Sequence, residues 1–522
     1  MARLVVLVPG AGQTTAVFEP LLERLRSEPE WPADTNILRS EHHATFMSRR
    51  RADDLVDDLA DDIYTEWETR GPYDDVILMG FSMGALLARG AYLRALGCTR
   101  EPSTLQEWAK HVSRIVLFAG ANRGLHLKWR DRLILTFAPW QFLLRDLLIG
   151  SDFITSVRLW WIRKLSGMET RPTVVQIRGK QDSRVQSEDS ADIQGFLEGY
   201  ELTLDANHHT LLKPDQGRQL SDRKYDVFRQ AVLRPFMDSD TGSRVDDPTE
   251  NVYFVVHGIR ARNDDWVEAV SEMIQSQLPN ATVIPPTYGR FSALQFAIPP
   301  LRRKKVRWFQ DIYSRELARN PQAHFNFVGH SYGTYLFGHS IKNISGMQFD
   351  RVSLNGSVLP AEWLWNTYRG QVKELRNARA RRDMPVGILC SALRGLRMRD
   401  IGTAGYTGFE IPFCMGSERF YYKGGHGASV SGEARQHILN FLLHGNNFSP
   451  QPNLRGEDEN FSRLSAGAWI LPYLLLLMCG LVSWAWIHFG TAGPLDPLQF
   501  VFVTLFVLIL FLSSAALVTL FI

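Results

Sequence analysis

The chain has 522 residues, of which 45% are hydrophobic and 22% are charged, and its formal net charge is +3 at pH 7. This length exceeds what one hydrophobic core usually holds, so at least two domains are expected, and the small net charge gives no general signal for nucleic-acid binding. The cysteines lack metal-ligand spacing and form no disulfide pattern, which fits a reducing compartment. They are Cys98, Cys390, Cys414 and Cys479. We expect no metal and no cofactor.

The first segment is predicted to be a strand that ends at a glycine turn. "RLVVLVP" (Arg3–Pro9) is short and rich in β-branched residues, and Gly10 and Gly12 follow it. We expect no signal peptide, because no small-residue cleavage site follows a long apolar stretch. A strand followed by Gly-x-Gly also begins dinucleotide sites, but Thr15 stands where the third glycine of that fingerprint belongs.

Strands and helices alternate through the rest of the first half. A helix is predicted over Arg51–Thr69. Strand-like runs follow in "DVILMG" (Asp75–Gly80), "RIVLFAG" (Arg114–Gly120) and "TVVQIRG" (Thr173–Gly179). Alternation of this kind predicts a mostly parallel sheet with helices on both faces.

A longer segment, residues 121–172, separates the last two of these runs. It interleaves tryptophan and phenylalanine with arginine, for example at Trp129, Arg130, Trp160 and Trp161. This composition suits a lid that faces a membrane interface and an acyl chain, or an ordinary packed helical cap.

The second half repeats the alternation after a polar, aspartate-rich linker at 238–250. A helix is predicted over Val306–Arg319. The strand-like runs are "VYFVVHG" (Val252–Gly258), "FNFVG" (Phe325–Gly329), "RVSLNGS" (Arg351–Ser357) and "VGILCSA" (Val386–Ala392). Two basic runs, Arg302–Arg307 and Arg376–Arg382, are interpreted as sites for anionic lipid head groups or as solvated helix faces.

The C-terminal part is predicted to anchor the chain in a membrane. A polar tether at 445–464 precedes two apolar segments, 465–489 and 498–522, each long enough to span a ~30 Å hydrocarbon core. The short link between them predicts a hairpin, which leaves the rest of the chain on one side of the membrane. We expect that side to be the cytoplasm (at the inner membrane if the source is bacterial). Two buried core helices are the alternative.

The pattern Gly-x-Ser-x-Gly occurs in both halves, each time between a strand-like run and a helix-like run. It is "GFSMG" around Ser82 and "GHSYG" around Ser331. A serine hydroxyl needs a neighbouring base, an acid that orients that base and donors for the oxyanion before it acts as a nucleophile. The glycines permit the crowded turn that lifts the serine out of the sheet.

Both halves resemble α/β-hydrolases, over roughly 2–237 and 251–444, since each has a glycine turn after its first strand, then the serine, an aspartate and a histidine in that order. The resemblance implies an α/β fold class: two tandem α/β-hydrolase domains at 1–237 and 251–444, with a lid around 121–172 in the first. The two C-terminal transmembrane helices complete the predicted architecture.

In the first half, the resemblance implies Ser82 as the nucleophile and Asp182, in "KQDSRV", as the acid. The base is His208 or its neighbour His209 in "DANHHTLLKP". The oxyanion donors implied are the backbone N–H of Met83 and that of Ala11 or Gly12.

In the second half, the resemblance implies Ser331 as the nucleophile and His426, in "GGHGAS", as the base. The acid is sought between Met384 and Ser417, where the carboxylates are Asp400 and Glu410, and Asp400 is preferred. The oxyanion donors implied are the N–H of Tyr332 and that of Ile259 or Arg260. His330 and His437 are expected to be structural.

These features predict a membrane-anchored serine hydrolase that cleaves carboxylic esters through an acyl-enzyme. The anchor and the lid favour lipids as partners and substrates, which points to a lipase, phospholipase or lysophospholipase. We expect both serines to be active, with Ser82 facing the bulkier or more lipidic substrate. Two other hypotheses are a non-catalytic scaffold that binds a partner or lipid, and a membrane-damaging effector.

Overall fold

The computed structural model describes residues 2–98, 104–120, 122, 124–125, 140–182, 199–208, 210–213, 220–235, 250–259, 265–289, 291–410, 421–445 and 458–489. The chain divides into two compact units, with the main boundary between Pro248 and Thr249. Residues 313–322 and 343–347 group with the first unit. The main boundary falls inside the linker predicted at 238–250.

The first unit is built on a six-stranded parallel sheet with the order β2-β1-β3-β4-β5-β6. Its strands are β1 (Arg3–Val8), β2 (Thr35–Arg39), β3 (Asp75–Phe81), β4 (Val112–Phe118), β5 (Thr173–Gly179) and β6 (Tyr200–Leu204). The helices are α1 (Glu19–Leu25), α2 (Ala52–Arg70), α3 (Met83–Ala95), α5 (Phe142–Asp146), α6 (Asp152–Ser166) and α8 (Asp222–Leu233), with short turns η1 (Thr15–Phe18) and η2 (Glu107–His111).

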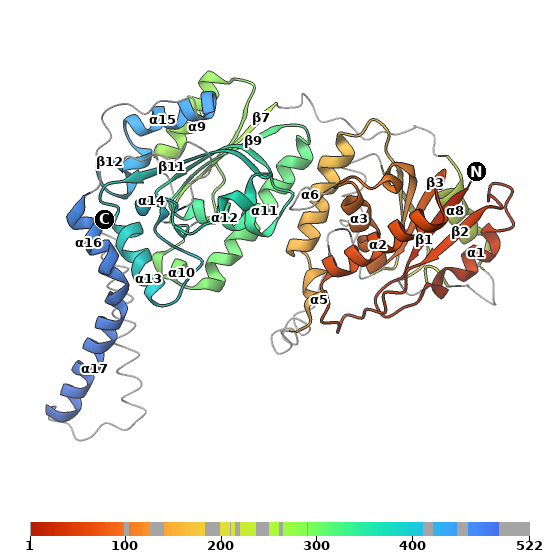
Figure 1. Cartoon of the computed structure of the whole chain (residues 1–522), viewed down its shortest axis with the longest axis horizontal. Helices are drawn as coiled ribbons and strands as arrows, with labels where there is room; N and C mark the ends of the chain where they lie inside the picture. The colour runs from red at the N-terminus through yellow and green to blue at the C-terminus, as the bar shows by residue number, and fades with distance from the viewer. Residues whose placement is uncertain are drawn as a thin grey trace. The chain divides into compact units, whose positions relative to one another are not determined.

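Alternation along the strands assigns these helices to the two faces of the sheet (Figure 1). Leu4 and Val6 of β1 share a core with α2, α3 and α6, whereas Val5 and Leu7 share the opposite core with α1 and α8. Successive strand residues point to opposite faces, so a continuous apolar strand fills both cores at once.

The second unit has another six-stranded parallel sheet, with the order β12-β11-β10-β9-β7-β8. Its strands are β7 (Asn251–Val256), β8 (Thr282–Ile284), β9 (His324–His330), β10 (Phe349–Asn355), β11 (Val372–Ala380) and β12 (Tyr421–Tyr422). Its longer helices are α9 (Asp265–Gln277), α11 (Pro299–Arg319), α12 (Tyr332–Asn343) and α15 (Glu433–His444); α10 (Ala293–Ala297), α13 (Ser391–Gly395), α14 (Ala404–Thr407) and the turns η3 (Trp365–Tyr368), η4 (Pro385–Cys390) and η5 (His426–Val430) are shorter.

The two sheets have the same topology. Read from the other edge, the second order is β8-β7-β9-β10-β11-β12, which matches the first strand for strand in sequence order. Two parallel sheets flanked by helices fit the α/β-hydrolase fold.

Two sequence predictions in the second unit are wrong. "VGILCSA" is not a strand, because Pro385–Cys390 forms a π-helical turn that runs into α13. The run Arg376–Arg382 is not a solvated helix face, because most of it belongs to β11. The Arg376 guanidinium is buried and donates to the Ser353 hydroxyl at 3.0 Å and to the Tyr422 hydroxyl at 2.6 Å, so its charge sits in a polar network within the sheet.

The segment predicted as a lid lies partly within the described residues. Residues 126–139, including Trp129, lie outside them. Helix α6 presents most of its side chains to the interior, and Trp161 packs against Tyr92 of α3 with the Arg89 guanidinium over its ring at 4.4 Å. This part of the segment is therefore a packed helix of the first unit.

One helical run near the C-terminus is long and apolar enough to cross a membrane, over Glu459–Leu481. It comprises α16 (Glu459–Gly467), the 3-10 turn η7 (Ala468–Ile470) and the part of α17 (Leu471–Phe489) up to Leu481. Helix α16 begins inside the stretch that was predicted to be a tether. The second apolar segment, 498–522, lies outside the described residues, and so does the predicted hairpin.

Candidate active sites

Both serines occupy a strained turn directly after a strand. Ser82 follows β3 with φ 54° and ψ −115°, and Ser331 follows β9 with φ 52°, a region that residues with a side chain rarely adopt. A Cβ on Gly84 would collide with the Val8 carbonyl, and one on Gly333 would lie 2.6 Å from the Val256 carbonyl oxygen. Glycine is therefore required where each helix passes the neighbouring strand.

The first site joins three of the predicted residues in one row of hydrogen bonds. His208 Nε2 lies 3.0 Å from Ser82 Oγ, and His208 Nδ1 lies 2.8 Å from Asp182 Oδ2. Asp182 and His208 are buried, at 8% and 7% exposed. With Nδ1–H donating to the carboxylate, Nε2 presents its lone pair to the serine hydroxyl, as a general base must. His209 lies outside the described residues.

The glycine turn beside Ser82 narrows the choice of oxyanion donor. The Gly12 N–H donates to the Ala44 carbonyl at 2.8 Å, so the prediction of Gly12 as a donor is wrong in this conformation. The backbone N–H of Ala11 remains as a candidate donor. So does the N–H of Met83, which is the first of α3 and therefore has no acceptor within the helix. His42 holds the turn, with Nε2 at 3.0 Å from the Pro9 carbonyl, and burial lowers the pKa of its imidazole.

In the second site, the acid beside the histidine is Asp383. His426 Nδ1 lies 2.9 Å from both carboxylate oxygens of Asp383, whose side chain is fully buried. The carboxylate also accepts the Val386 N–H at 3.0 Å, and the Asp383 carbonyl accepts the Gly387 N–H at 2.7 Å. These bonds fix the carboxylate at the start of the π-helical turn η4.

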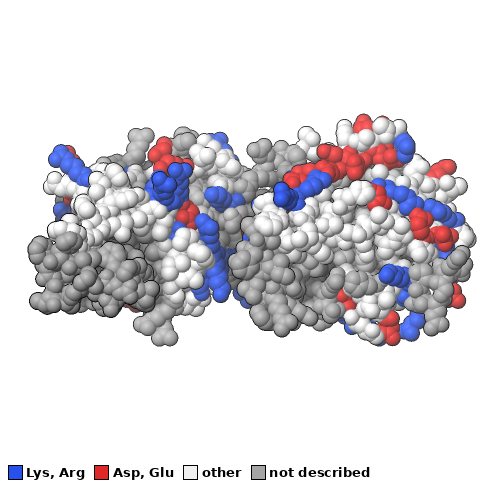
Figure 2. Space-filling view, turned by 90° about the horizontal axis from the view of Figure 1, so that it is seen from below, with Lys and Arg blue, Asp and Glu red and all other residues white. Residues whose placement is uncertain are grey.

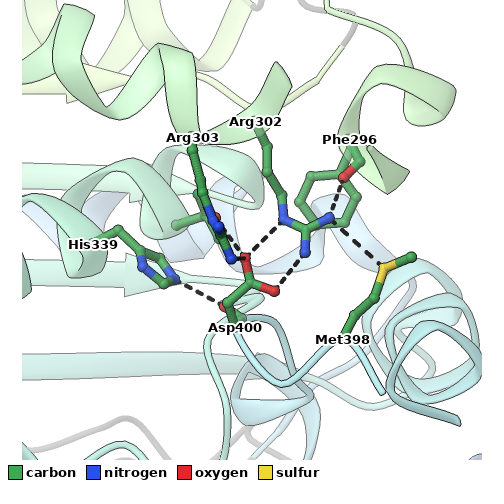
Figure 3. Close-up of polar contacts among 7 residues, drawn as sticks. Phe296, Arg302, Arg303, His339, Met398 and Asp400 are labelled. Carbon is green, nitrogen blue, oxygen red and sulfur yellow. Dashed lines mark hydrogen bonds and ion pairs between the residues drawn. The ribbon is translucent and has the colours of Figure 1, made fainter. Parts of the chain in front are cut away.

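The prediction of Asp400 as the acid is therefore wrong. Its carboxylate accepts two hydrogen bonds from the Arg302 guanidinium, at 2.5 Å and 3.1 Å (Figure 3). It accepts a third from the Tyr335 hydroxyl at 2.9 Å. Burial alone would raise the pKa of Asp400, but the bonds and charge of Arg302 outweigh it and lower the pKa. Asp400 holds a loop against α11 and α12, because Arg302 is completely buried and needs a counter-charge. The alternate, Glu410, is exposed and is not brought to His426.

Ser331 and His426 are neighbours without a direct bond. Among the described residues, no hydrogen bond joins Ser331 Oγ to His426; the Ser331 N–H donates to the Asn355 carbonyl at 3.0 Å, and His426 lies against the next residue, Gly356. The His330 ring lies 4.5 Å from that of His426, and its Nε2 is 3.2 Å from the His426 carbonyl. Burial lowers the pKa of His330 to about 3, and charge repulsion from the nearby His426 adds to this shift.

The oxyanion turn of the second site is closely packed. Gly258 lies so close to Ser331 that an added Cβ would be 3.0 Å from the serine Cβ, and the Tyr288 hydroxyl donates to the carbonyls of His257 and Gly258. Tyr332 begins α12 as Met83 begins α3, while Ile259 is half-buried on the turn. Arg260 lies outside the described residues.

Strand ends give a signal that could have found Asp383. Asp182 stands three positions after the last residue of β5, and Asp383 stands three positions after the last residue of β11. His208 and His426 each stand four positions after the ends of β6 and β12. The range predicted for the second acid starts at Met384, one residue after Asp383, because the preceding strand is predicted at Val386–Ala392 and not at β11.

No protein-family model and no curated protein matches the chain. Solved structures similar to part of it include a lipase-esterase related protein from Clostridium acetobutylicum, at 18% identity and TM-score 0.25, covering 40% of this chain and 89% of that one. The type II thioesterase BorB from the borrelidin biosynthetic cluster matches at 15% identity and TM-score 0.29, covering 44% and 92%. The metagenome-derived lipolytic enzymes LipS and LipT match at 15% and 0.30, covering 44% and 91%.

Proposed function

We propose that this chain is a membrane-anchored serine hydrolase that cleaves carboxylic esters, with lipids as its substrates. The observation that carries the proposal is the row Ser82–His208–Asp182, in which a serine on a strained turn, a histidine and a buried carboxylate are hydrogen-bonded in order. Such a row serves to activate a hydroxyl that is otherwise a poor nucleophile.

The reaction proposed for the first unit is acyl transfer to water. Ser82 Oγ attacks the ester carbonyl while its proton passes to His208 Nε2, and Asp182 stabilises the resulting imidazolium. The N–H groups of Met83 and Ala11 receive the oxyanion. When the C–O bond to the alcohol breaks, His208 returns the proton to the leaving oxygen. Water then repeats the steps against the acyl-enzyme and releases the acid.

The lipid substrate is inferred from the helical run that ends in α17. Its outward side chains are large and apolar, including Leu474, Leu477 and Met478, which are more than half exposed. A single helix with such a surface is stable in a bilayer rather than in water. An enzyme held at a bilayer meets esters of lipids at high local concentration, so lipase, phospholipase or lysophospholipase activity is the proposed class.

For the second unit we propose the corrected triad Ser331, His426 and Asp383. The same strand positions carry it, and an incomplete serine–histidine bond in the substrate-free state does not argue against turnover, since such bonds often tighten when substrate binds. The alternative proposed for this unit is binding and anchoring without turnover. It is favoured by the missing Ser331–His426 hydrogen bond and by the packing of the proposed membrane helix on this unit.

Labelling by a fluorophosphonate probe tests both units. With the full chain in detergent or nanodiscs, peptide mass spectrometry measures the adduct on each serine. We expect Ser82→Ala and Ser331→Ala each to remove one adduct, while Ser276→Ala, an exposed serine on α9, changes neither. Absence of an adduct on Ser82 in the folded wild type would overturn the hydrolase proposal. An adduct on Ser82 alone would assign the second unit to anchoring.

Hydrolysis of lipids is tested separately. Cells that express the wild type or the double variant Ser82→Ala, Ser331→Ala are compared by lipid profiling. We expect an ester-linked lipid class to decrease, and its free acid to increase, with the wild type alone. Identical lipid profiles from cells whose wild-type protein, in a parallel sample, reacts with the probe would restrict the substrate to non-lipid esters.

A further inference from the structure

A pocket of about 580 Å³ lies in the second unit where the membrane helix leaves it. Its walls come from α13 and the residues that follow it, from α14, and from the run α16–η7–α17. The lining residues that matter for its chemistry are Arg394, Arg397, Thr403, Ser462, Trp469 and Tyr473. None of them belongs to the candidate active site.

Two arginines give the pocket positive charge. The Arg394 guanidinium donates to both carboxylate oxygens of Glu362, at 2.8 Å and 2.5 Å, so it is held in place and partly neutralised. Arg397 is exposed, and in the part of the chain that the structure describes no carboxylate lies within ion-pair distance of it. Its backbone has φ 63°, and its N–H donates to the Arg394 carbonyl at 2.8 Å.

Hydroxyl groups line the pocket beside these charges. Thr407 belongs to α14 and Thr403 directly precedes this helix; their hydroxyl oxygens lie 3.1 Å apart. Ser462 belongs to α16. The Thr407 hydroxyl donates to the Thr403 carbonyl at 3.1 Å, so the donors offered to a ligand are the guanidinium groups and the Ser462 hydroxyl. These donors match the oxygens of a phosphate group, which arginine binds in a planar, two-pronged manner. Figure 2 shows that blue side chains are more frequent than red ones on the visible face of this unit (left).

Aromatic residues mark the level of the pocket on the membrane helix. Trp469 and Tyr473 are 52% and 47% exposed and stand where the helix changes from packed to exposed. The Tyr473 hydroxyl donates to the Gly395 carbonyl at 2.6 Å, which ties the start of α17 to α13. Tryptophan and tyrosine concentrate at membrane–water interfaces, where the head groups lie.

We propose that this pocket binds the phosphate head group of an anionic phospholipid, whose acyl chains lie along the apolar side of α17. The inference rests on the membrane anchoring proposed above. A lipid is favoured over a soluble phosphate because the pocket adjoins an exposed apolar helix that the acyl chains would cover.

Native mass spectrometry of the full chain in detergent tests the proposal. The protein is titrated with dioctanoyl phosphatidylglycerol, with dioctanoyl phosphatidylcholine and with inorganic phosphate. We expect saturable binding of phosphatidylglycerol, about tenfold weaker in Arg397→Gln because one charge-assisted contact is lost. The variant Arg369→Gln removes an exposed arginine outside the pocket and should bind like the wild type. A second variant, Ala466→Phe, fills the pocket without changing its charge and should also weaken binding.

Three outcomes would overturn the proposal: equal loss in Arg397→Gln and Arg369→Gln, equal binding of phosphatidylcholine, or occupancy by inorganic phosphate at the same concentration as the lipid. Probe labelling of Ser82 and Ser331 is measured on the same samples. Labelling retained on Ser82 without selective lipid binding removes this inference alone, whereas absence of labelling on Ser82 removes the proposed hydrolase function.

Discussion

The two candidate sites use the same strand positions but differ in how their histidines are held. In the first, His208 bridges Ser82 and Asp182, and the residue before the serine is Phe81, whose ring lies 5.4 Å from that of His208. In the second, His330 occupies that position, and its ring nitrogen lies near the His426 carbonyl. The acid–histidine pair is thus present in both units, whereas among the described residues the serine–histidine bond is present in the first unit alone.

The largest effect should come from removing each acid. Asp182→Asn and Asp383→Asn are expected to slow the reaction of their own serine with the fluorophosphonate probe about 10³- to 10⁴-fold, because the imidazole loses its orientation and its counter-charge. The other serine should react at the wild-type rate. Rates are measured from the adduct on each serine peptide. Loss of both reactivities in either variant would break the assignment of separate sites.

Asp400→Asn should damage the second unit without removing its acid. It leaves the buried Arg302 guanidinium uncompensated, so the free energy of unfolding of that unit should fall by about 3–5 kcal/mol. Hydrogen exchange in increasing urea measures it, with Asp350→Asn as the control, because the partners of Asp350, His324 and Lys373, are exposed. If Ser331 instead loses reactivity in a variant of unchanged stability, Asp400 is the acid after all.

Phe461→Ala tests whether helix α16 supports the second acid. The Phe461 ring packs on Gly387, in the turn that follows Asp383, and the Ser465 hydroxyl donates to the Gly387 carbonyl at 2.7 Å. Truncation should cost about 3 kcal/mol of packing and lower the reactivity of Ser331 but not that of Ser82. Leu464→Ala, on the exposed side of the same helix, is the control. Equal effects on both serines would contradict a local support.

Low pH should destabilise the second unit through protonation of His330. Its folded pKa of about 3 lies below the ordinary value near 6.5, so the folded state favours the neutral ring. The stability is fully present above pH 6.5 and is lost as pH falls towards 3, by about 2 kcal/mol at pH 5. His330→Gln should flatten this dependence, as followed by hydrogen exchange of β9. Burial also lowers the pKa of His339, to about 4, so part of the dependence should remain.

The sequence predicts the strands whose side chains are apolar in succession. β3, β5 and β9 were located from such runs, and the serines that follow β3 and β9 with them. β11 could not be found this way, because Arg376 and Arg379 make it look polar; only the partners on β10 and β12 show that these charges are satisfied. The apolar run at Val386 misleads for the opposite reason, since it forms the π-helical turn η4, with Phe461 of α16 against Gly387, and belongs to no strand.

The same limit explains Asp400. Its spacing from His426 equals that of Asp182 from His208, which made it a reasonable choice in one dimension. The number of residues between an aspartate and a histidine does not show where the chain places that aspartate relative to the sheet. The partner of Asp400, Arg302, lies 98 positions away in the sequence, and no local pattern announces that pair.

The run from Glu459 to Phe489 is helical throughout its described length, and its first turns are packed against the second unit. At 1.5 Å per residue it is about 46 Å long, which exceeds the ~30 Å hydrocarbon core. If the chain is anchored as proposed, the extra helix length lies outside the bilayer and acts as a rigid spacer rather than a flexible tether. The second unit would keep one height and one tilt above the lipid surface, free to turn only about the membrane normal, so that reaching a substrate would depend on lipids moving up to the site.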